Sequence, residues 1–176
     1  MIRAALIFAV AASVWLATAG LSGQQPLRPK MAVAELGPAT FKATGINGGT
    51  VTLSAADVYQ LPQQTVNTTD HGTAVTFQGV LLSDVLSKVA TPVGEAFNKA
   101  VASCYVVVEA ADGYKAVFSW AEIDPAFTDR KLYLVTKRDG RPISSKDGPF
   151  ELIVPGEKRN SRWVRQVAAL NIRQAN

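Results

Sequence analysis

The sequence is poor in the side chains that build metal sites, disulfides and nucleophilic catalytic sites. Its 176 residues include one cysteine, Cys104, and one histidine, His71. A single cysteine excludes an intramolecular disulfide. One cysteine and one histidine are too few for a four-ligand zinc site or for the usual paired haem ligands. A catalytic triad of the Ser-His-Asp or Cys-His type would have to use His71.

Long hydrophobic runs are also scarce, and the longest uncharged one lies at the N-terminus. Residues 4–17 carry no charge and follow Arg3, and Ala17 and Ala19 supply the small residues of a cleavage site. The run is shorter than the roughly 20 apolar residues that span a bilayer. This pattern predicts a signal peptide over residues 1–19, cleaved after Ala19, and hence a periplasmic or secreted protein. An uncleaved N-terminal anchor is the alternative.

The overall composition is that of a folded protein with a small basic excess. Hydrophobic residues make up 48% of the chain, which excludes a disordered or fibrous protein. The formal net charge is +4, and removal of Arg3 with the signal peptide lowers it to +3. Export argues against a nucleic-acid partner, so we expect the partner to be a small anionic ligand or a periplasmic protein. We expect no stable membrane insertion after signal cleavage.

Two regions follow the predicted signal peptide. Residues 20–38 are rich in proline and polar side chains and are predicted to form a flexible leader, and residues 39–176 are predicted to form one domain. Short helices are predicted to begin at Ser54, to follow Val80, and to cover 95–102. Many strands, few helices and no βαβ rhythm predict an α+β fold with mixed or mostly antiparallel sheets. The predicted strands are 41–45, 49–53, 64–68, 73–77, 103–109, 114–120, 131–136, 150–154 and 163–172.

Six short segments form a recognisable series. They are Leu53–Pro62 (compared with "Lt..dL..lP"), Phe77–Leu86 ("w.Gv.l.dlL"), Asp112–Tyr114 ("DGY"), Gly140–Ile143 ("nG.pL"), Gly148–Pro155 ("GP.rlvvP") and Arg162–Val167 ("vKWv..i"). In this order they resemble the oxidoreductase molybdopterin-binding domain family. The resemblance extends over about residues 40–174. It implies the sulfite-oxidase-like fold, a molybdopterin cofactor and oxidoreductase activity.

One departure from that family concerns the metal ligand. The family uses a cysteine thiolate from the interval before the segment that begins at Phe77. In this chain, residues 63–76 contain no cysteine, and the expected position falls near residues 67–70. The neutral oxygen of Thr or Asn is a poor substitute for a soft thiolate. The interval is also shorter than in the family's enzymes, so part of the cofactor pocket is expected to be missing.

Cys104 is a poor replacement for the missing ligand. It alternates with Val106 and Val108 in a predicted strand, so we expect a buried packing residue. Tyr114 belongs to the "DGY" turn, which lies near the substrate side in the family. It is therefore either a structural turn residue or part of the pocket wall.

Five residues are candidates for binding an anion. His71 lies in the interval through which the family's active-site loop runs, and Lys158, Arg159, Arg162 and Arg165 follow Pro155-Gly156. In the family, basic groups near this C-terminal segment help to hold the pterin phosphate, and arginine offers a fork of donors for such a group. The resemblance implies a cofactor-binding or anion-binding role for these five residues. A surface-turn histidine beside a solvated basic loop is the alternative.

Three functions remain open at this point. The first is a degenerate, non-catalytic domain, with no catalytic residue, metal ligand or cofactor, that binds a small anionic ligand or a protein partner in the inherited cleft. The second is a molybdopterin-dependent oxidoreductase, or a subunit of one, that retains the cofactor without the cysteine. The third is a periplasmic sensory or interaction module. The sequence does not decide whether the protein is an enzyme.

The signal-peptide hypothesis predicts the N-terminus of the mature protein. Protein recovered from the periplasm should begin near Gly20, because signal peptidase cuts after small residues at the −3 and −1 positions. Intact-mass spectrometry of the exported protein measures this directly. A periplasmic mass that still includes residues 1–19 would contradict the cleaved signal and support the uncleaved anchor.

Overall fold

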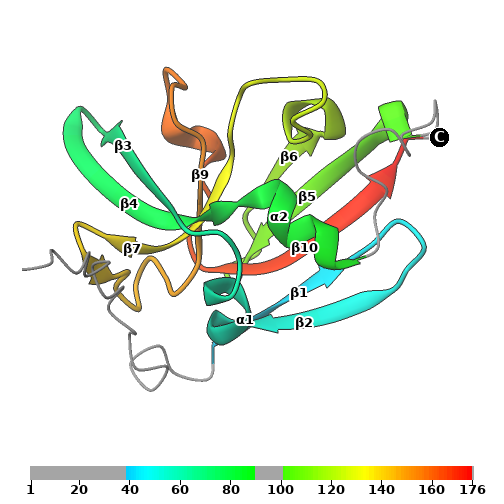
Figure 1. Cartoon of the computed structure of the whole chain (residues 1–176), viewed down its shortest axis with the longest axis horizontal. Coiled ribbons are helices and arrows are strands. Elements are labelled where there is room, and N and C mark those ends of the chain that lie inside the picture. Colours follow the sequence, from blue (N-terminus) through cyan, green and yellow to red (C-terminus); the bar gives the residue numbers. More distant parts are fainter. Residues whose placement is uncertain (1–38, 90–100, 176) are drawn as a thin grey trace, which may run out of the picture. The chain divides into compact units, whose positions relative to one another are not determined.

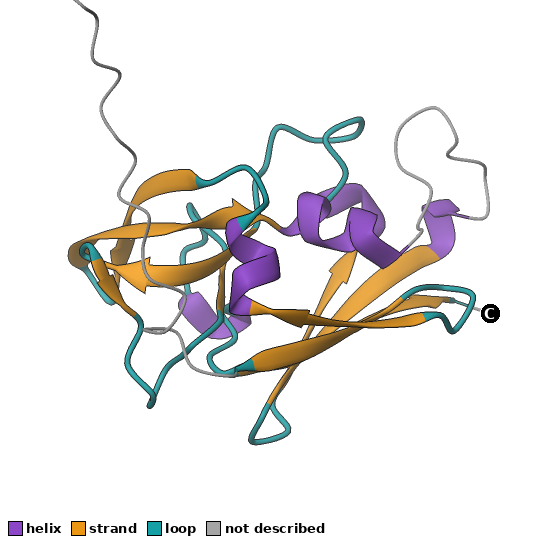
Figure 2. Cartoon of the chain, turned by 60° about the horizontal axis from the view of Figure 1, so that its bottom comes forward, coloured by secondary structure: helices purple, strands orange, loops and turns teal. Residues whose placement is uncertain are grey.

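The computed structural model describes residues 39–89 and 101–175, all of which belong to the unit Ala32–Asn176. The predicted signal peptide, the predicted leader and most of the predicted helix over 95–102 lie outside the described residues. Strands predominate, and the helices are short segments between them (Figure 2). The α+β prediction is therefore confirmed.

The first sheet joins the two ends of the domain. In the described part of the chain its order is β2-β1-β10-β5-β6. The last strand, β10, lies between β1, to which it is parallel, and β5, to which it is antiparallel (Figure 1). The pairs β1–β2 and β5–β6 are antiparallel hairpins. The strands are β1 (Thr40–Thr44), β2 (Thr50–Ser54), β5 (Cys104–Ala110), β6 (Lys115–Ser119) and β10 (Val167–Gln174).

The second sheet is antiparallel. Its order in the described residues is β3-β4-β7-β8, and β9 pairs with β7. A register shift between Gln78 and Gly79 interrupts the pairing of β4 with β7. The strands are β3 (Gln64–Asp70), β4 (Thr73–Leu81), β7 (Tyr133–Arg138), β8 (Arg141–Pro142) and β9 (Glu151–Ile153).

Short helices connect the strands. Helix α1 (Ala55–Tyr59) has the capping box that its sequence predicts: Asp57 N–H donates to Ser54 Oγ at 3.2 Å, and Ser54 N–H donates to Asp57 Oδ2 at 2.8 Å. Helix α2 (Leu82–Leu86) follows β4 directly. In the ranges 39–89 and 101–175, no helix combines the length and apolar character needed to cross a membrane. Single-turn 3-10 helices cover Ser87–Val89, Val101–Ser103, Trp120–Glu122 and Asn160–Arg162.

The core contains side chains from both sheets. Cys104, Val106 and Val108 of β5 are at most 2% exposed and point to the same face, as the alternation predicted. Phe41 of β1 meets Phe150 edge to face, with ring centroids 4.9 Å apart. Such contacts between large buried rings contribute beyond the apolar area that they remove from water.

The predictions differ from the structure at two strand ends. Residues 78–80 were expected to lead into a helix, but they continue β4 as far as Leu81. The strand expected over 163–172 begins at Val167, because Val164 forms one isolated bridge with Leu152 and Gln166 has a positive φ of 48°. Trp163 and Val164 are therefore buried core residues outside the β10 ladder.

A substitution at Gly79 tests the close contact between β4 and β7. A Cβ atom there would collide with the Leu134 carbonyl oxygen and lie 2.5 Å from the Val135 Cα. We expect Gly79→Ala to lower the free energy of unfolding by about 1–3 kcal/mol or more, the usual cost of overpacking. Urea denaturation measures this. Gly49→Ala is the matched control, because a Cβ at Gly49 meets nothing within 4 Å. Equal stability of the two variants would contradict the close approach.

Candidate functional site

A cavity of about 320 Å³ opens where the end of β3, the β5–β6 turn and the segment before β10 meet. Its walls come from both sheets and from residues distant in the sequence. Carboxylates, hydrogen-bonding groups and two aromatic rings share its surface. The lining residues are Asp70, His71, Ala110, Asp112, Tyr114, Glu151, Asn160, Ser161, Trp163 and Arg165.

A tight hairpin places His71 at this cavity. Asp70 pairs with Thr73 across β3 and β4, so His71 and Gly72 form a two-residue turn. Their φ angles are 49° and 84°, as a type I′ turn requires. The His71 side chain is 77% exposed, whereas that of Asp70 is buried.

Asp70 is a buried carboxylate whose charge is matched. Its Oδ2 lies 2.8 Å from an Arg138 guanidinium nitrogen, and its Oδ1 accepts a 2.8 Å hydrogen bond from the Asn160 side chain. The His71 Nε2 is further away, at 3.7 Å from Oδ1. Asp70 therefore joins β3, β7 and the 160–162 helix at the base of the cavity, as buried charges are retained when they are paired and hydrogen-bonded.

Glu151, at the start of β9, is the unusual acid of the site. It is 2% exposed, and its Oε2 is the single buried side-chain oxygen without a hydrogen-bond partner in the part of the chain that the structure describes. Its other oxygen, Oε1, lies 3.9 Å from Arg165 Nε, which is too far for a hydrogen bond. Glu151 is therefore a buried carboxyl group with spare capacity to accept a hydrogen bond.

Burial raises the pKa of Glu151 from 4.5 to about 7. The nearby Arg165 opposes this shift, while the carboxylates of Asp147 and Asp70 add to it. Arg138 has a smaller opposing effect. Glu151 therefore gains or loses its proton near neutral pH.

The β5–β6 turn forms the opposite wall. Gly113 has a φ of 87°, and the Asp112 Oδ1 accepts a 2.9 Å hydrogen bond from the Tyr114 N–H. The Tyr114 hydroxyl donates to the Ser161 carbonyl oxygen. This contact ties the turn to the 160–162 helix across a large sequence separation. Tyr114 thus lines the cavity, one of the two roles considered from the sequence.

The Trp163 ring is held in place beside the cavity. Its indole N–H donates to the Val154 carbonyl oxygen at 3.1 Å, and the ring meets Phe77 edge to face at 5.7 Å. Trp163 is 8% exposed. With its polar atom satisfied, the ring offers an apolar and aromatic surface to the cavity.

The five basic candidates are distributed over different environments. His71 and Arg165 line the cavity. Lys158 and Arg159 are exposed and do not belong to its lining. Arg162 does not line the cavity, and its guanidinium group forms ion pairs with Glu122 and Glu157. The structure therefore brings together two of the five residues.

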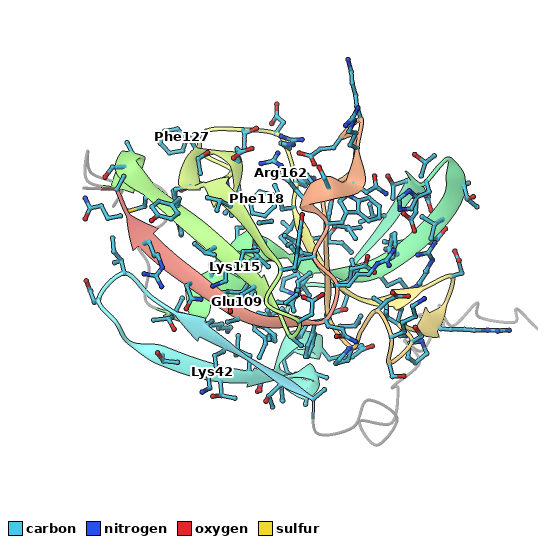
Figure 3. The ribbon with its side chains drawn as sticks, turned by 180° about the vertical axis from the view of Figure 1, so that it is seen from behind. Lys42, Glu109, Lys115, Phe118, Phe127 and Arg162 are labelled. Atoms are coloured by element: carbon cyan, nitrogen blue, oxygen red, sulfur yellow. The ribbon has the colours of Figure 1, made fainter. Side chains whose placement is uncertain are left out.

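Arg162 holds the 157–162 segment against the first sheet. Its guanidinium group pairs with Glu157 and, at 3.0 Å, with Glu122, and Arg130 pairs with Glu157 at 2.8 Å. The guanidinium carbon of Arg162 also lies 4.8 Å from the centroid of the Phe118 ring, which Figure 3 shows beside it. These contacts indicate that Arg162 stabilises the fold.

A second cavity of about 460 Å³ adjoins the first through Glu151, which lines both. Arg138 and Arg141 line it together with Asp139 and Asp147. The basic and acidic groups on this wall are thus intermixed.

Sequence reasoning missed Glu151 and Asn160. Glu151 lies in an apolar strand, Phe150–Val154, where a charged residue needs an explanation. The pattern "GP.rlvvP" also has a basic residue at the position that Glu151 occupies. Both signals were present in the sequence. Asn160 had none, because its role depends on a hydrogen bond to Asp70, 90 residues earlier.

The residues present do not fit the molybdopterin group that the resemblance implies. The segment expected to carry the thiolate is the β3–β4 hairpin, which closes through a two-residue turn without a cysteine. Cys104 is buried in β5 and does not line the cavity, and burial raises the pKa of its thiol. An anionic pterin phosphate in this cavity would also face the carboxyl groups of Asp70, Asp112 and Glu151.

Comparison with known proteins gives a likeness of fold. No family model matches the chain, and no curated protein matches it. Among solved structures, it is similar to the sulfane dehydrogenase SoxCD from Paracoccus pantotrophus, with a TM-score of 0.58 and 17% sequence identity. The match covers 77% of this chain and 38% of that chain. The likeness shows a distant relation of fold and is consistent with the sulfite-oxidase-like architecture that the six motifs predicted.

The ionisation of Glu151 predicts how stability changes with pH. Because its pKa is raised in the folded state, the folded protein binds more protons than the unfolded chain between about pH 4.5 and 7. The free energy of unfolding should therefore fall across this range as pH rises, by up to about 3 kcal/mol. Urea denaturation at pH 5 and pH 8 measures the change.

Two variants separate Glu151 from the other titrating groups. Glu151→Gln should remove this part of the pH dependence, because the amide does not ionise. Glu109→Gln should retain it, since Glu109 is one-third exposed and pairs with Lys115 on the neighbouring strand (Figure 3). An unchanged pH dependence in Glu151→Gln would show that another group is responsible.

Proposed function

We propose that this protein is an exported ligand-binding domain of sulfite-oxidase-like fold that does not perform molybdenum chemistry. The observation that carries the proposal is the β3–β4 hairpin. A two-residue turn, His71-Gly72, closes the segment where the resemblance requires a metal-ligating cysteine. Neither the turn nor the neighbouring strand residues supply a thiolate.

The cavity is the binding site in this proposal. Its volume of about 320 Å³ falls in the range of small-molecule sites. Its walls are held by specific contacts: Asp70 with Arg138 and Asn160, and Tyr114 with Ser161. Side chains fixed in this way are preorganised, which lowers the entropic cost of binding.

The second candidate function is an oxidoreductase, or a subunit of one, that holds molybdopterin without a protein thiolate. The fold likeness to a sulfane dehydrogenase favours it. The chain spans 38% of that protein, so the activity of the whole neighbour does not transfer to it directly. The two candidates differ in metal content.

The test is to produce the full chain in a molybdenum-replete host and to measure molybdenum and sulfite oxidation. A known molybdenum enzyme made in the same host is the positive control. We expect no stoichiometric molybdenum and no sulfite-dependent reduction of an electron acceptor, because the thiolate is absent from the hairpin.

Near-stoichiometric molybdenum would overturn the proposal and establish the second candidate. The variant Cys104→Ala then identifies the ligand. Loss of the metal in this variant would make Cys104 the ligand, and retention would mean that the pterin holds the metal without the protein's cysteine.

A further inference from the structure

The charges around the cavity leave a buried carboxyl group, Glu151, without a hydrogen-bonded cation. Arg138 pairs with Asp70 at 2.8 Å, and Arg165 lies 3.4 Å from Asp147. The Glu151 Oε1 is further from Arg165, at 3.9 Å. Each arginine is thus closest to another carboxylate, and Glu151 lacks a hydrogen-bonded cation.

The unmatched group is buried and able to accept a hydrogen bond. The Glu151 side chain is 2% exposed, and its Oε2 has no hydrogen-bond partner among residues 39–89 and 101–175. A buried acceptor left without a donor costs about 1–3 kcal/mol. A cationic ligand beside this carboxyl group would supply the opposite charge that the protein does not, and a charged donor that hydrogen-bonds the carboxylate would add a charge-assisted bond.

Other side chains that line the cavity also favour a cationic ligand. Asp112 is exposed and has no ion-pair partner in the described part of the chain, although its Oδ1 accepts a hydrogen bond from Tyr114 N–H. Tyr114 and Trp163 line the same cavity. Aromatic rings attract organic cations through the negative charge of their faces.

We propose that this cavity binds a small organic ligand through a primary ammonium group, which pairs with the carboxylate of Glu151 beside Tyr114 and Trp163. The inference rests on the proposed function and specifies the chemical class of its ligand. It replaces the anionic ligand expected from the basic segment, because Lys158, Arg159 and Arg162 lie outside the cavity lining.

Binding should strengthen as pH rises from 6 to 8. The pKa of Glu151 is raised to about 7, so this change increases its ionised fraction roughly tenfold. The groups that face Glu151 are Arg165 and Asp147 from the loops, Asp70 from β3 and Arg138 from β7. His71 also lines the cavity, at its rim.

The experiment compares three probes of equal chain length. Isothermal titration of the full chain with butylammonium, butyrate and butanol separates cationic, anionic and neutral ligands. Inorganic phosphate and calcium ion are further arms. We expect butylammonium to bind most tightly, with affinity increasing roughly tenfold between pH 6 and pH 8.

Variants then locate the binding group. Glu151→Gln should abolish butylammonium binding and its pH dependence, while Glu109→Gln should bind as the parent does. His71→Asn should retain the pH dependence, and asparagine tolerates the positive φ of that position. Chemical-shift changes of the Tyr114 ring and the Trp163 indole N–H on titration should place the probe in this cavity.

Several results would overturn the inference. The first is tighter binding of butyrate, phosphate or calcium than of butylammonium. The second is a failure of butylammonium to bind. The third is unchanged butylammonium binding in Glu151→Gln. Tight anion binding to protein that lacks molybdenum would leave the proposed function standing and reject only the ammonium ligand. Stoichiometric molybdenum in the protein would instead reject the proposed function itself.

Discussion

The pairing of β10 with both β1 and β5 is the constraint on which the rest of the first sheet depends. Without it, the β1–β2 and β5–β6 hairpins would have no common hydrogen-bonded neighbour, and an isolated hairpin is marginally stable in water. The strand also sets the position of the residues immediately before it. Trp163 and Arg165 lie just before β10, which begins at Val167 and is held between β1 and β5, and both residues line the cavity.

The cavity has a different electrostatic character from the one that the basic C-terminal segment suggested. Arginine is abundant there, but ion pairs within the fold use much of its charge. Arg162 contacts Glu122 and Glu157, and Arg138 contacts Asp70. What remains at the wall is a buried carboxyl group, Glu151, with an oxygen free to accept a hydrogen bond. Counting basic residues in a segment therefore did not show which of them line the cavity, where His71 and Arg165 lie beside three carboxyl groups.

The likeness to a sulfane dehydrogenase and the missing thiolate are compatible with each other. A fold can be retained while the site on it changes, because the core contacts that hold the sheets are separate from the residues that contact a cofactor. In this chain the core includes the Phe41–Phe150 pair, far from the β3–β4 turn in sequence. The two-residue turn between β3 and β4 can therefore coexist with that packing.

Local sequence determined the hairpins, the capping box at Ser54 and the burial of Cys104, because turn residues, caps and strand alternation act over a few neighbouring positions. It also showed that a cysteine is missing from residues 63–76. Only the tertiary structure decided which polar groups share the cavity. Asn160 reaches Asp70 across 90 residues, and Glu151 lies between partners supplied by other elements. Those contacts depend on the order in which strands pair, and no local pattern encodes that order.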